Sequence, residues 1–200
     1  MTRSLYIIGG AGTGKSTFTG QVMDNVVMAH CVDLEDLCTG PNSRGTQITL
    51  RGHRLNGYTD RSGEGIYLGA MREEFPGTDG LDRVSYIPGE AWLIDGAVEG
   101  TLPDFIIAEG ATLAVRRFLK ILHRTTDLLI IFLTAEDFVK DLRFCQRGST
   151  QDDGFVKATA TRSQNLAVDM AKEGIKVWEA DSADPAQWNE ALSIACDHLR

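Results

Sequence analysis

Residues 9–16 read GGAGTGKS and match the phosphate-binding pattern GxxxxGK[ST] at every fixed position. The motif follows an apolar run, residues 4–8, which predicts a short buried strand. A helix is expected to begin near Lys15, with Phe18 and Val22 on its inner face. Glycines let successive backbone N–H groups turn inward around phosphate oxygens, and the helix N-terminus adds partial positive charge. The sequence therefore predicts a strand–loop–helix unit that binds the phosphates of a nucleotide.

The residue types in this loop indicate separate tasks for its members. Lys15 is expected to contact the β- and γ-phosphates and to act in catalysis, and the Ser16 hydroxyl is expected to bind Mg²⁺. The residues expected to bind the nucleotide are Gly9, Gly10, Ala11, Gly12, Thr13, Gly14, Lys15, Ser16 and Thr17.

Beyond the loop, apolar runs alternate with amphipathic stretches of helical spacing. Further strands are predicted at residues 27–32, 105–108, 127–133 and 175–178. Alternation of this kind is typical of a parallel sheet covered by helices on both faces. We therefore expect an α/β fold of the P-loop NTPase class with a five-stranded parallel sheet.

Residues 40–102 interrupt the alternation. They hold 12 of the chain's 21 glycines and few long periodic stretches. A structureless segment of this size is improbable inside a compact domain, so short strands or helices are expected within it. The sequence indicates a single domain, residues 1–200, in which residues 40–102 form a substrate-binding insertion.

Composition limits the classes of function. Twenty Lys and Arg against 28 Asp and Glu give a formal net charge of −8, which argues against a surface that coats nucleic acid and leaves room for a local basic groove. No apolar run approaches the roughly 18 residues of a membrane span, and the first residues lack a signal-peptide layout. The four cysteines have no CxxC spacing, so reduced thiols in a cytoplasmic protein are expected.

The phosphate-binding loop, the strand pattern and the C-terminal half together resemble small P-loop kinases of the nucleoside monophosphate kinase and shikimate kinase type, although residues 40–102 do not. The chain has no NKxD motif of a GTPase, and the run at 105–108 ends in one acid, Glu109, rather than in consecutive acids. The resemblance implies an ATP-dependent phosphotransferase that requires Mg²⁺. Glu109 is expected to hold a metal-bound water and to lie near the substrate, with Asp95 as the alternative acid.

The resemblance also implies roles for three arginines. Arg143 and Arg147 look like the arginines that open the lid of such kinases, and Arg162 looks like the one that returns from the lid to the phosphates. Guanidinium groups suit this task because they stay charged and bind phosphate oxygens in a bidentate manner. Arg143 is expected to bind the nucleotide and, with Arg147, to act in catalysis. The lid is expected over about residues 143–165, and the adenine beside residues 181–185.

The acids after the second predicted strand bear on the acceptor. Shikimate kinases and phage polynucleotide kinases resemble this chain in placing an Asp there, whereas monophosphate kinases place a hydroxyl residue and an arginine. A carboxylate can orient a hydroxyl acceptor and take its proton. Asp33 is therefore expected to be catalytic, and Asp33 and Asp36 to contact substrate. The alternative interpretation is an acidic first turn of a helix.

Within residues 40–102, the candidate substrate contacts are Arg61, Arg72 and Asp79. The segment 75–79 resembles phage-encoded P-loop kinases, some of which phosphorylate hydroxymethyl groups on pyrimidines in DNA. A base flipped out of the duplex would suit such a role. A phage-encoded protein of this kind is expected in the host cytoplasm.

Three functions remain open at this stage. They are a kinase for a hydroxyl of a nucleoside, nucleotide or modified DNA base, a nucleoside monophosphate kinase, and a P-loop ATPase switch that transfers phosphate only to water. The acids at 33–36 favour the first over the second, and the lid arginines favour either kinase, because kinases must exclude water. The expected partners are ATP and a nucleotide-type acceptor, with no membrane, and the protein is expected to be a monomer or homodimer.

Overall fold

The elements follow one another as strand, loop and helix at the N-terminus, in the order that the P-loop motif predicts. The structure, a computed structural model, describes residues 1–30, 33–42, 44–57, 63–72, 76–80, 86–148 and 152–200. The strands are β1 (Arg3–Gly9), β2 (Val27–His30), β3 (Glu35–Pro41), β4 (Gln47–Gly57), β5 (Glu64–Leu68), β6 (Phe105–Glu109), β7 (Asp127–Thr134) and β8 (Lys176–Asp181). The helices are α1 (Lys15–Val26), the 3₁₀ turn η1 (Thr78–Gly80), α2 (Tyr86–Glu99), α3 (Arg116–Thr125), α4 (Asp137–Arg147), α5 (Asp153–Lys172) and α6 (Pro185–Leu199). None of the described helices is both long enough and apolar enough to cross a membrane.

All described strands join one mixed sheet in the order β2-β4-β5-β6-β1-β7-β8, with β3 following β2 along the same edge of β4. The five neighbours β5, β6, β1, β7 and β8 are parallel. Strands β2, β3 and β4 extend the sheet in antiparallel fashion. The carboxyl ends of the parallel strands therefore meet at a single edge, where α/β proteins bind their ligands.

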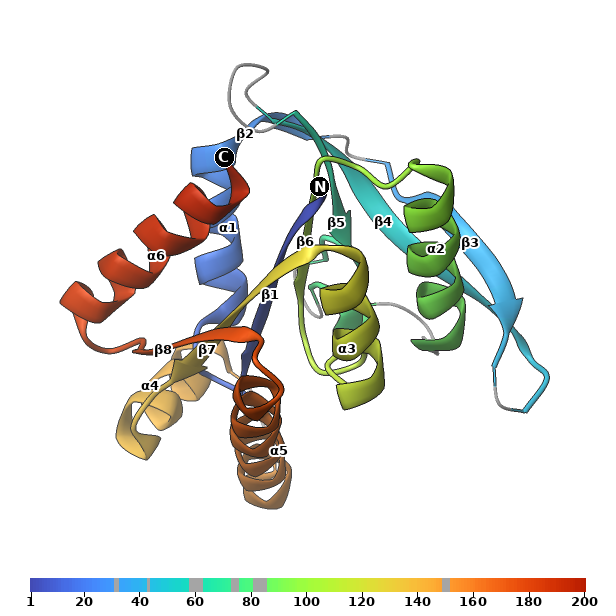
Figure 1. Ribbon diagram of the computed structural model, residues 1–200. Helices are drawn as coiled ribbons and strands as arrows, with labels where there is room; N and C mark the ends of the chain where they lie inside the picture. Colours follow the sequence, from blue (N-terminus) through green and yellow to red (C-terminus); the bar gives the residue numbers. More distant parts are fainter. Residues whose placement is uncertain (31–32, 43, 58–62, 73–75, 81–85, 149–151) are drawn as a thin grey trace.

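Helices cover both faces of the sheet, giving three layers (Figure 1). Alternate side chains of β1 enter different cores. Leu5 and Ile7 pack with α1 and α6, whereas Tyr6 and Ile8 pack on the side of α2, α3 and α5. Each of these four side chains is at most 2% exposed. Phe18 is also fully buried, which confirms the predicted inner face of α1.

The predicted fold class is confirmed, but one of the predicted parallel strands is wrong. The run at 27–32 yields the short strand β2, which lies at the sheet edge antiparallel to β4. The place beside β6 is taken by β5, which comes from residues 40–102. That segment has strands and a helix of its own, as expected, and two of its strands belong to the central sheet. An apolar run indicates burial but not the neighbour with which a strand pairs, and this explains the error.

The expected lid over about residues 143–165 includes the end of α4 and the first half of α5. Residues 149–151, between the two helices, lie outside the described part of the chain. Helix α4 ends at Gly148, whose φ of 62° places it in the left-handed region. Glycine ends a helix in this conformation because it has no Cβ to clash with the backbone. The glycine at 148 is thus explained as a helix end.

Candidate active site

The phosphate-binding loop connects the end of β1 to the start of α1, at the carboxyl edge of the parallel strands. Gly12 and Gly14 have φ values of 78° and 86°, which only glycine adopts without steric cost. The Lys15 side chain folds back into the loop, where its Nζ donates to the carbonyl oxygens of Gly9 at 3.1 Å and Gly10 at 2.9 Å. Burial lowers the pKa of Lys15, and the nearby carboxylates act in the opposite direction. The ammonium group therefore lies inside the loop, as phosphate binding requires.

Glu109 ends β6 beside this loop and is 2% exposed. The Tyr67 hydroxyl donates to its Oε1 at 3.1 Å, whereas Oε2 is buried and has no hydrogen-bond partner among the described residues. Burial raises the pKa of Glu109, and the Lys15 ammonium and the Tyr67 and Ser16 hydroxyls act against this rise. An unpartnered buried carboxylate oxygen is costly, and next to a serine hydroxyl it offers the hard oxygen ligands that Mg²⁺ prefers. Ser16 and Glu109 therefore fit a magnesium ion.

Asp79, on η1, brings a second carboxylate to the site. Its Oδ1 accepts the N–H of Ala111 at 2.8 Å, the N–H of Thr112 at 3.0 Å and the hydroxyl of Thr112 at 2.9 Å. These donors belong to the turn after β6. Asp79 is exposed and close enough to Lys15 to oppose the fall in its pKa. The structure thus places Asp79 with Lys15 and Glu109, as a substrate contact would require.

A glycine allows this loop to lie against Glu109. Gly77 has a φ of 72°, and a Cβ there would lie 2.5 Å from Cγ of Glu109. The Thr78 hydroxyl donates to the backbone carbonyl of Glu109 at 2.8 Å. An antiparallel bridge between Ala70 and Gly77 closes the loop. The segment after β5 is therefore fixed to the end of β6 by backbone contacts.

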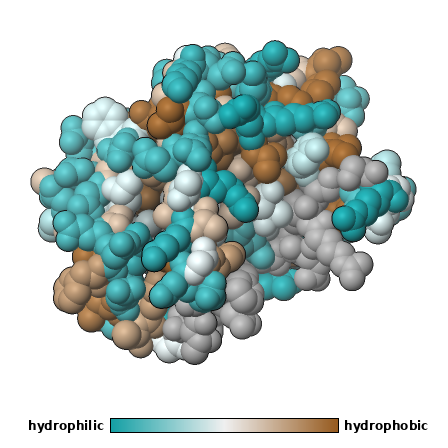
Figure 2. All heavy atoms as spheres, turned by 90° about the horizontal axis from the view of Figure 1, so that it is seen from below, coloured by the Kyte–Doolittle hydropathy of each residue, from teal (hydrophilic) through white to brown (hydrophobic). Residues whose placement is uncertain are grey.

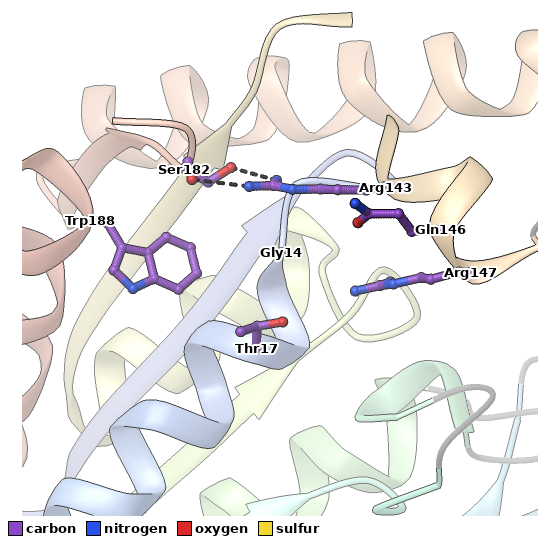
Figure 3. Close-up of a pocket in the computed structure, with 7 residues that line it drawn as sticks. All are labelled: Gly14, Thr17, Arg143, Gln146, Arg147, Ser182 and Trp188. Atoms are coloured by element: carbon purple, nitrogen blue, oxygen red, sulfur yellow. Dashed lines mark hydrogen bonds between the residues drawn. The ribbon is translucent and has the colours of Figure 1, made fainter. Parts of the chain in front are cut away.

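On the other side of the phosphate-binding loop, α4 and the segment after β8 enclose a cavity of about 300 Å³. Its lining residues are Gly14, Thr17, Arg143, Gln146, Arg147, Ser182 and Trp188 (Figure 3). Arg143 donates to Gly12 O at 2.9 Å, to Ser182 Oγ at 2.8 Å and to Ser182 O at 3.0 Å. Arg147 points into the same cavity, and burial together with its charge lowers the pKa of Arg143. Hydrogen bonds thus hold Arg143 to both the phosphate-binding loop and the segment after β8. Arg147 faces the space where a nucleotide would lie.

Trp188 forms the opposite wall of this cavity (Figure 3). Its ring meets Phe18 edge-on with centroids 5.1 Å apart, and its Nε1 donates to Gln21 Oε1 at 2.7 Å. Ser182 lies within residues 181–185, where the adenine was expected. Gln146 and Trp188 were not recognised as cavity residues from the sequence. Trp188 reaches the phosphate-binding loop because α6 packs against α1.

Arg162 lies on α5, whose first half packs against the phosphate-binding loop. A Cβ on Gly10 would lie 3.2 Å from Ala160, and the Ala11 N–H donates to Thr159 Oγ1 at 3.4 Å. Arg162 is exposed and borders a narrow hollow with Gly9 and Gly110, at the ends of β1 and β6. Figure 2 looks onto this edge of the molecule, where hydrophilic residues cover much of the central surface.

Asp33 and Asp36 are not brought to this site. They follow β2 at the sheet edge, so β4 and β5 lie between them and β6. Both are exposed, and Asp36 forms an ion pair with Arg51, with 2.8 Å between Oδ1 and Nε. Residues 35–41 form a strand, so the helix-start interpretation also fails. The expectation was wrong in placement because it assumed that β2 was the parallel strand next to β6.

The remaining candidates lie in three different places. Arg61 is outside the described residues. Arg72 is exposed and follows β5, in a segment anchored by the Met71 N–H, which donates to His53 Nε2 at 3.2 Å. Asp95, the alternative to Glu109, is exposed on α2, which packs against β3. Glu109, rather than Asp95, is therefore the acid beside Ser16.

No curated protein sequence matches the chain. Among solved structures, an unliganded sugar kinase from Janibacter sp. HTCC2649 is similar with a TM-score of 0.43 and 15% identity, covering 100% of this chain and 95% of its own. A gluconokinase from Sinorhizobium meliloti 1021 is similar with a TM-score of 0.47 and 14% identity, covering 98% of this chain and 91% of its own.

A family model gives the more specific result. Residues 1–191 match the model described as P-loop Nucleotide Kinase3, which spans the loop, both carboxylates and all three arginines of the site. The chain therefore belongs to the P-loop nucleotide kinase 3 family and is a phosphotransferase with ATP as its donor.

Proposed function

We propose that this kinase transfers the γ-phosphate of ATP to a hydroxyl group of a nucleoside or nucleotide, or of a hydroxymethyl-modified pyrimidine in phage DNA. The observation that carries the proposal is the position of Asp79, an exposed carboxylate beside Lys15 and Glu109. A neutral hydroxyl must lose a proton when it attacks phosphorus. A carboxylate at the point of transfer supplies the base for that proton.

The donor side needs charge neutralisation and exclusion of water. Lys15 binds the β- and γ-phosphates, and Arg147 faces the same space from α4. Ser16 and Glu109 would hold Mg²⁺, which when bound neutralises charge on the phosphate oxygens. Arg143 fixes the cavity wall through its bonds to Gly12 and Ser182. In this proposal, Arg147 contacts the phosphates, and Arg143 maintains the shape of the cavity.

On the acceptor side, Asp79 takes the role that the sequence suggested for Asp33. Asp79 follows β5, the parallel strand that pairs with β6. Its Oδ1 is held by three donors, and its Oδ2 has no hydrogen-bond partner among the described residues. We infer that Oδ2 orients the acceptor hydroxyl and receives its proton, while Arg162 contacts the substrate from α5.

A second function, nucleoside monophosphate kinase, is favoured by one observation. Arg72 is the first arginine after β5, and monophosphate kinases place an arginine after the equivalent strand. Asp79 argues against this function, because a carboxylate beside the transferring phosphate repels an acceptor that is itself a phosphate. The attacking oxygen of a monophosphate is also largely ionised near neutral pH and needs no base.

A product assay distinguishes these functions. The enzyme is incubated with Mg²⁺ and ATP and with nucleosides, nucleoside monophosphates or oligonucleotides containing hydroxymethyl pyrimidines, and phosphorylated products are identified by mass spectrometry. The proposal expects a phosphate ester on a hydroxyl. Diphosphates as the sole products would establish the monophosphate kinase instead, and ATP consumption without any phosphorylated acceptor would indicate an ATPase.

A further inference from the structure

Two buried tyrosines flank β6 near the active site. Tyr67 on β5 is 1% exposed, and Tyr6 on β1 is 0% exposed. They lie on opposite faces of the sheet. Their hydroxyls differ in what they contact, because Tyr67 donates to Oε1 of Glu109 and Tyr6 donates to the backbone oxygen of Gly110 at 3.2 Å. Of the two hydroxyls, that of Tyr67 donates to a carboxylate of the proposed site, whereas that of Tyr6 lies against the backbone of Gly110 and the side chain of Thr78.

The Tyr67 hydrogen bond acts on a carboxylate with two unequal oxygens. The Tyr67 hydroxyl is the donor of this bond, and Oε1 is the acceptor. With Oε1 fixed, the carboxylate plane has a defined orientation, and its partnerless Oε2 is the oxygen available to a cation. Hydrogen bonds from neighbouring groups commonly orient metal ligands in this way.

A second observation concerns two opposite charges, those of Lys15 and Glu109. The Lys15 ammonium interacts with Glu109 at a distance, yet its hydrogen bonds go to Gly9 and Gly10, and no ion pair joins Lys15 to Glu109 in the described part of the chain. A carboxylate released from Tyr67 is free to turn toward the ammonium group. Such a contact would withdraw the lysine from phosphate and the carboxylate from the cation.

We propose that Tyr67 is a positioning residue that holds Glu109 so that Oε2 faces the cation beside Ser16. The inference rests on the magnesium site of the proposed function and is independent of the acceptor. It predicts that removing the Tyr67 hydroxyl weakens the cooperation between Mg²⁺ and nucleotide. The affinity for nucleotide in the absence of Mg²⁺ should not change.

The test measures ADP affinity by calorimetry, once with excess Mg²⁺ and once with EDTA, and takes the ratio of the two affinities. Tyr67→Phe should reduce that ratio by about tenfold, the lower end of what outer-shell partners of a metal contribute. Its ADP affinity in EDTA should match the wild type. Tyr6→Phe removes an equally buried hydroxyl that bonds a backbone oxygen, and it should leave the ratio unchanged.

The double variant Tyr67→Phe/Glu109→Gln tests whether Tyr67 acts through Glu109. If Tyr67 acts through Glu109, the ratio of the double variant equals that of Glu109→Gln. If Tyr67→Phe alone does not fold, the comparison of the double variant with Glu109→Gln still tests the inference. The glutamine at position 109 is neutral, so the double variant contains no buried carboxylate that has lost its hydrogen-bond donor. An unchanged ratio in Tyr67→Phe, an equal loss with and without Mg²⁺, or a further drop in the double variant would overturn the inference. A wild-type ratio of one would refute the magnesium site itself, whatever acceptor the product assay identifies.

Discussion

The two sides of the active site carry opposite charge. The donor side, formed by the phosphate-binding loop, α4 and the segment after β8, presents Lys15, Arg143 and Arg147. The acceptor side, formed by the segment after β5, presents Asp79, and Glu109 at the end of β6 lies between the two sides. In the proposed function, a γ-phosphate would be attracted to the first side and a proton leaving the acceptor to the second. The difference would give the site a direction, with phosphate bound on one side and the acceptor's proton removed on the other.

The largest effect is expected from the donor side. Lys15→Ala should lower phosphoryl transfer by about 10³–10⁵-fold, comparable to removing another cation that acts on a transferring phosphoryl group. The fold should persist, because the Lys15 ammonium group bonds, within the described part of the chain, to carbonyl oxygens of its own loop, those of Gly9 and Gly10. Activity is measured at saturating Mg²⁺ and ATP, with circular dichroism as the control for folding. Activity within a few-fold of wild type would exclude the loop as the donor site.

The acceptor side is tested by Asp79→Asn. The substitution keeps an oxygen that can accept from Ala111 and Thr112 and removes the basic carboxylate. We expect kcat to fall by about 10²–10⁴-fold, the usual contribution of a general base, with ATP affinity unchanged. Asp33→Asn and Asp36→Asn serve as matched controls and should be as fast as wild type. A slow Asp33→Asn enzyme would reverse the assignment of the base.

The contact between the two sides is tested by Gly77→Ala. Its Cβ would meet Glu109 Cγ at 2.5 Å and its carbonyl oxygen at 2.7 Å, so the loop that carries Asp79 must shift. We expect kcat to fall about 10–100-fold, since an ångström of misplacement is enough for such a loss. Gly45→Ala is the control, because Gly45 has a similar φ of 77° and no atom within 4 Å of the added Cβ. Equal kinetic effects of the two substitutions would show that strain, not contact with Glu109, is responsible.

Substitutions of the two arginines of α4 should have smaller effects on the kinetic constants, and these effects should differ between Arg143 and Arg147. Arg143→Ala removes the bonds to Gly12 and Ser182, each contributing about 0.5–1.5 kcal/mol, and should raise KM for ATP about tenfold with a lesser change in kcat. Arg147→Ala should lower kcat more than it raises KM, since Arg147 points into the cavity beside the phosphate-binding loop. Steady-state kinetics with varied ATP give both constants. Equal changes of kcat and KM in the two variants would contradict the proposal that Arg143 maintains the cavity and Arg147 contacts the phosphates.

The donor side could be predicted from the sequence because its central element is contiguous. Eight consecutive residues, 9–16, determine the loop, and Glu109 is recognisable as the acid that ends an apolar run. The acceptor side depends on which strand pairs with β6, and short-range periodicity contains no such information. Strand β5 is only five residues long and begins among glycines, whereas the run at 27–32 is longer and more apolar. From the sequence, Asp79 is therefore recognisable only as a candidate substrate contact, and Asp33 is favoured as the general base.

The edge position of β3 gives the acids at 35 and 36 a different significance. Backbone groups on the outer side of an edge strand can pair with a strand of another molecule, and charges, bulges and proline oppose this. Strand β3 has all three, with Glu35 and Asp36 near its start, a register shift between Asp36 and Cys38, and Pro41 at its end. The acidic stretch thus lies where charge opposes pairing of β3 with a strand of another molecule. We expect that replacing Asp36 with an apolar residue promotes aggregation, measured by light scattering, and leaves turnover unchanged.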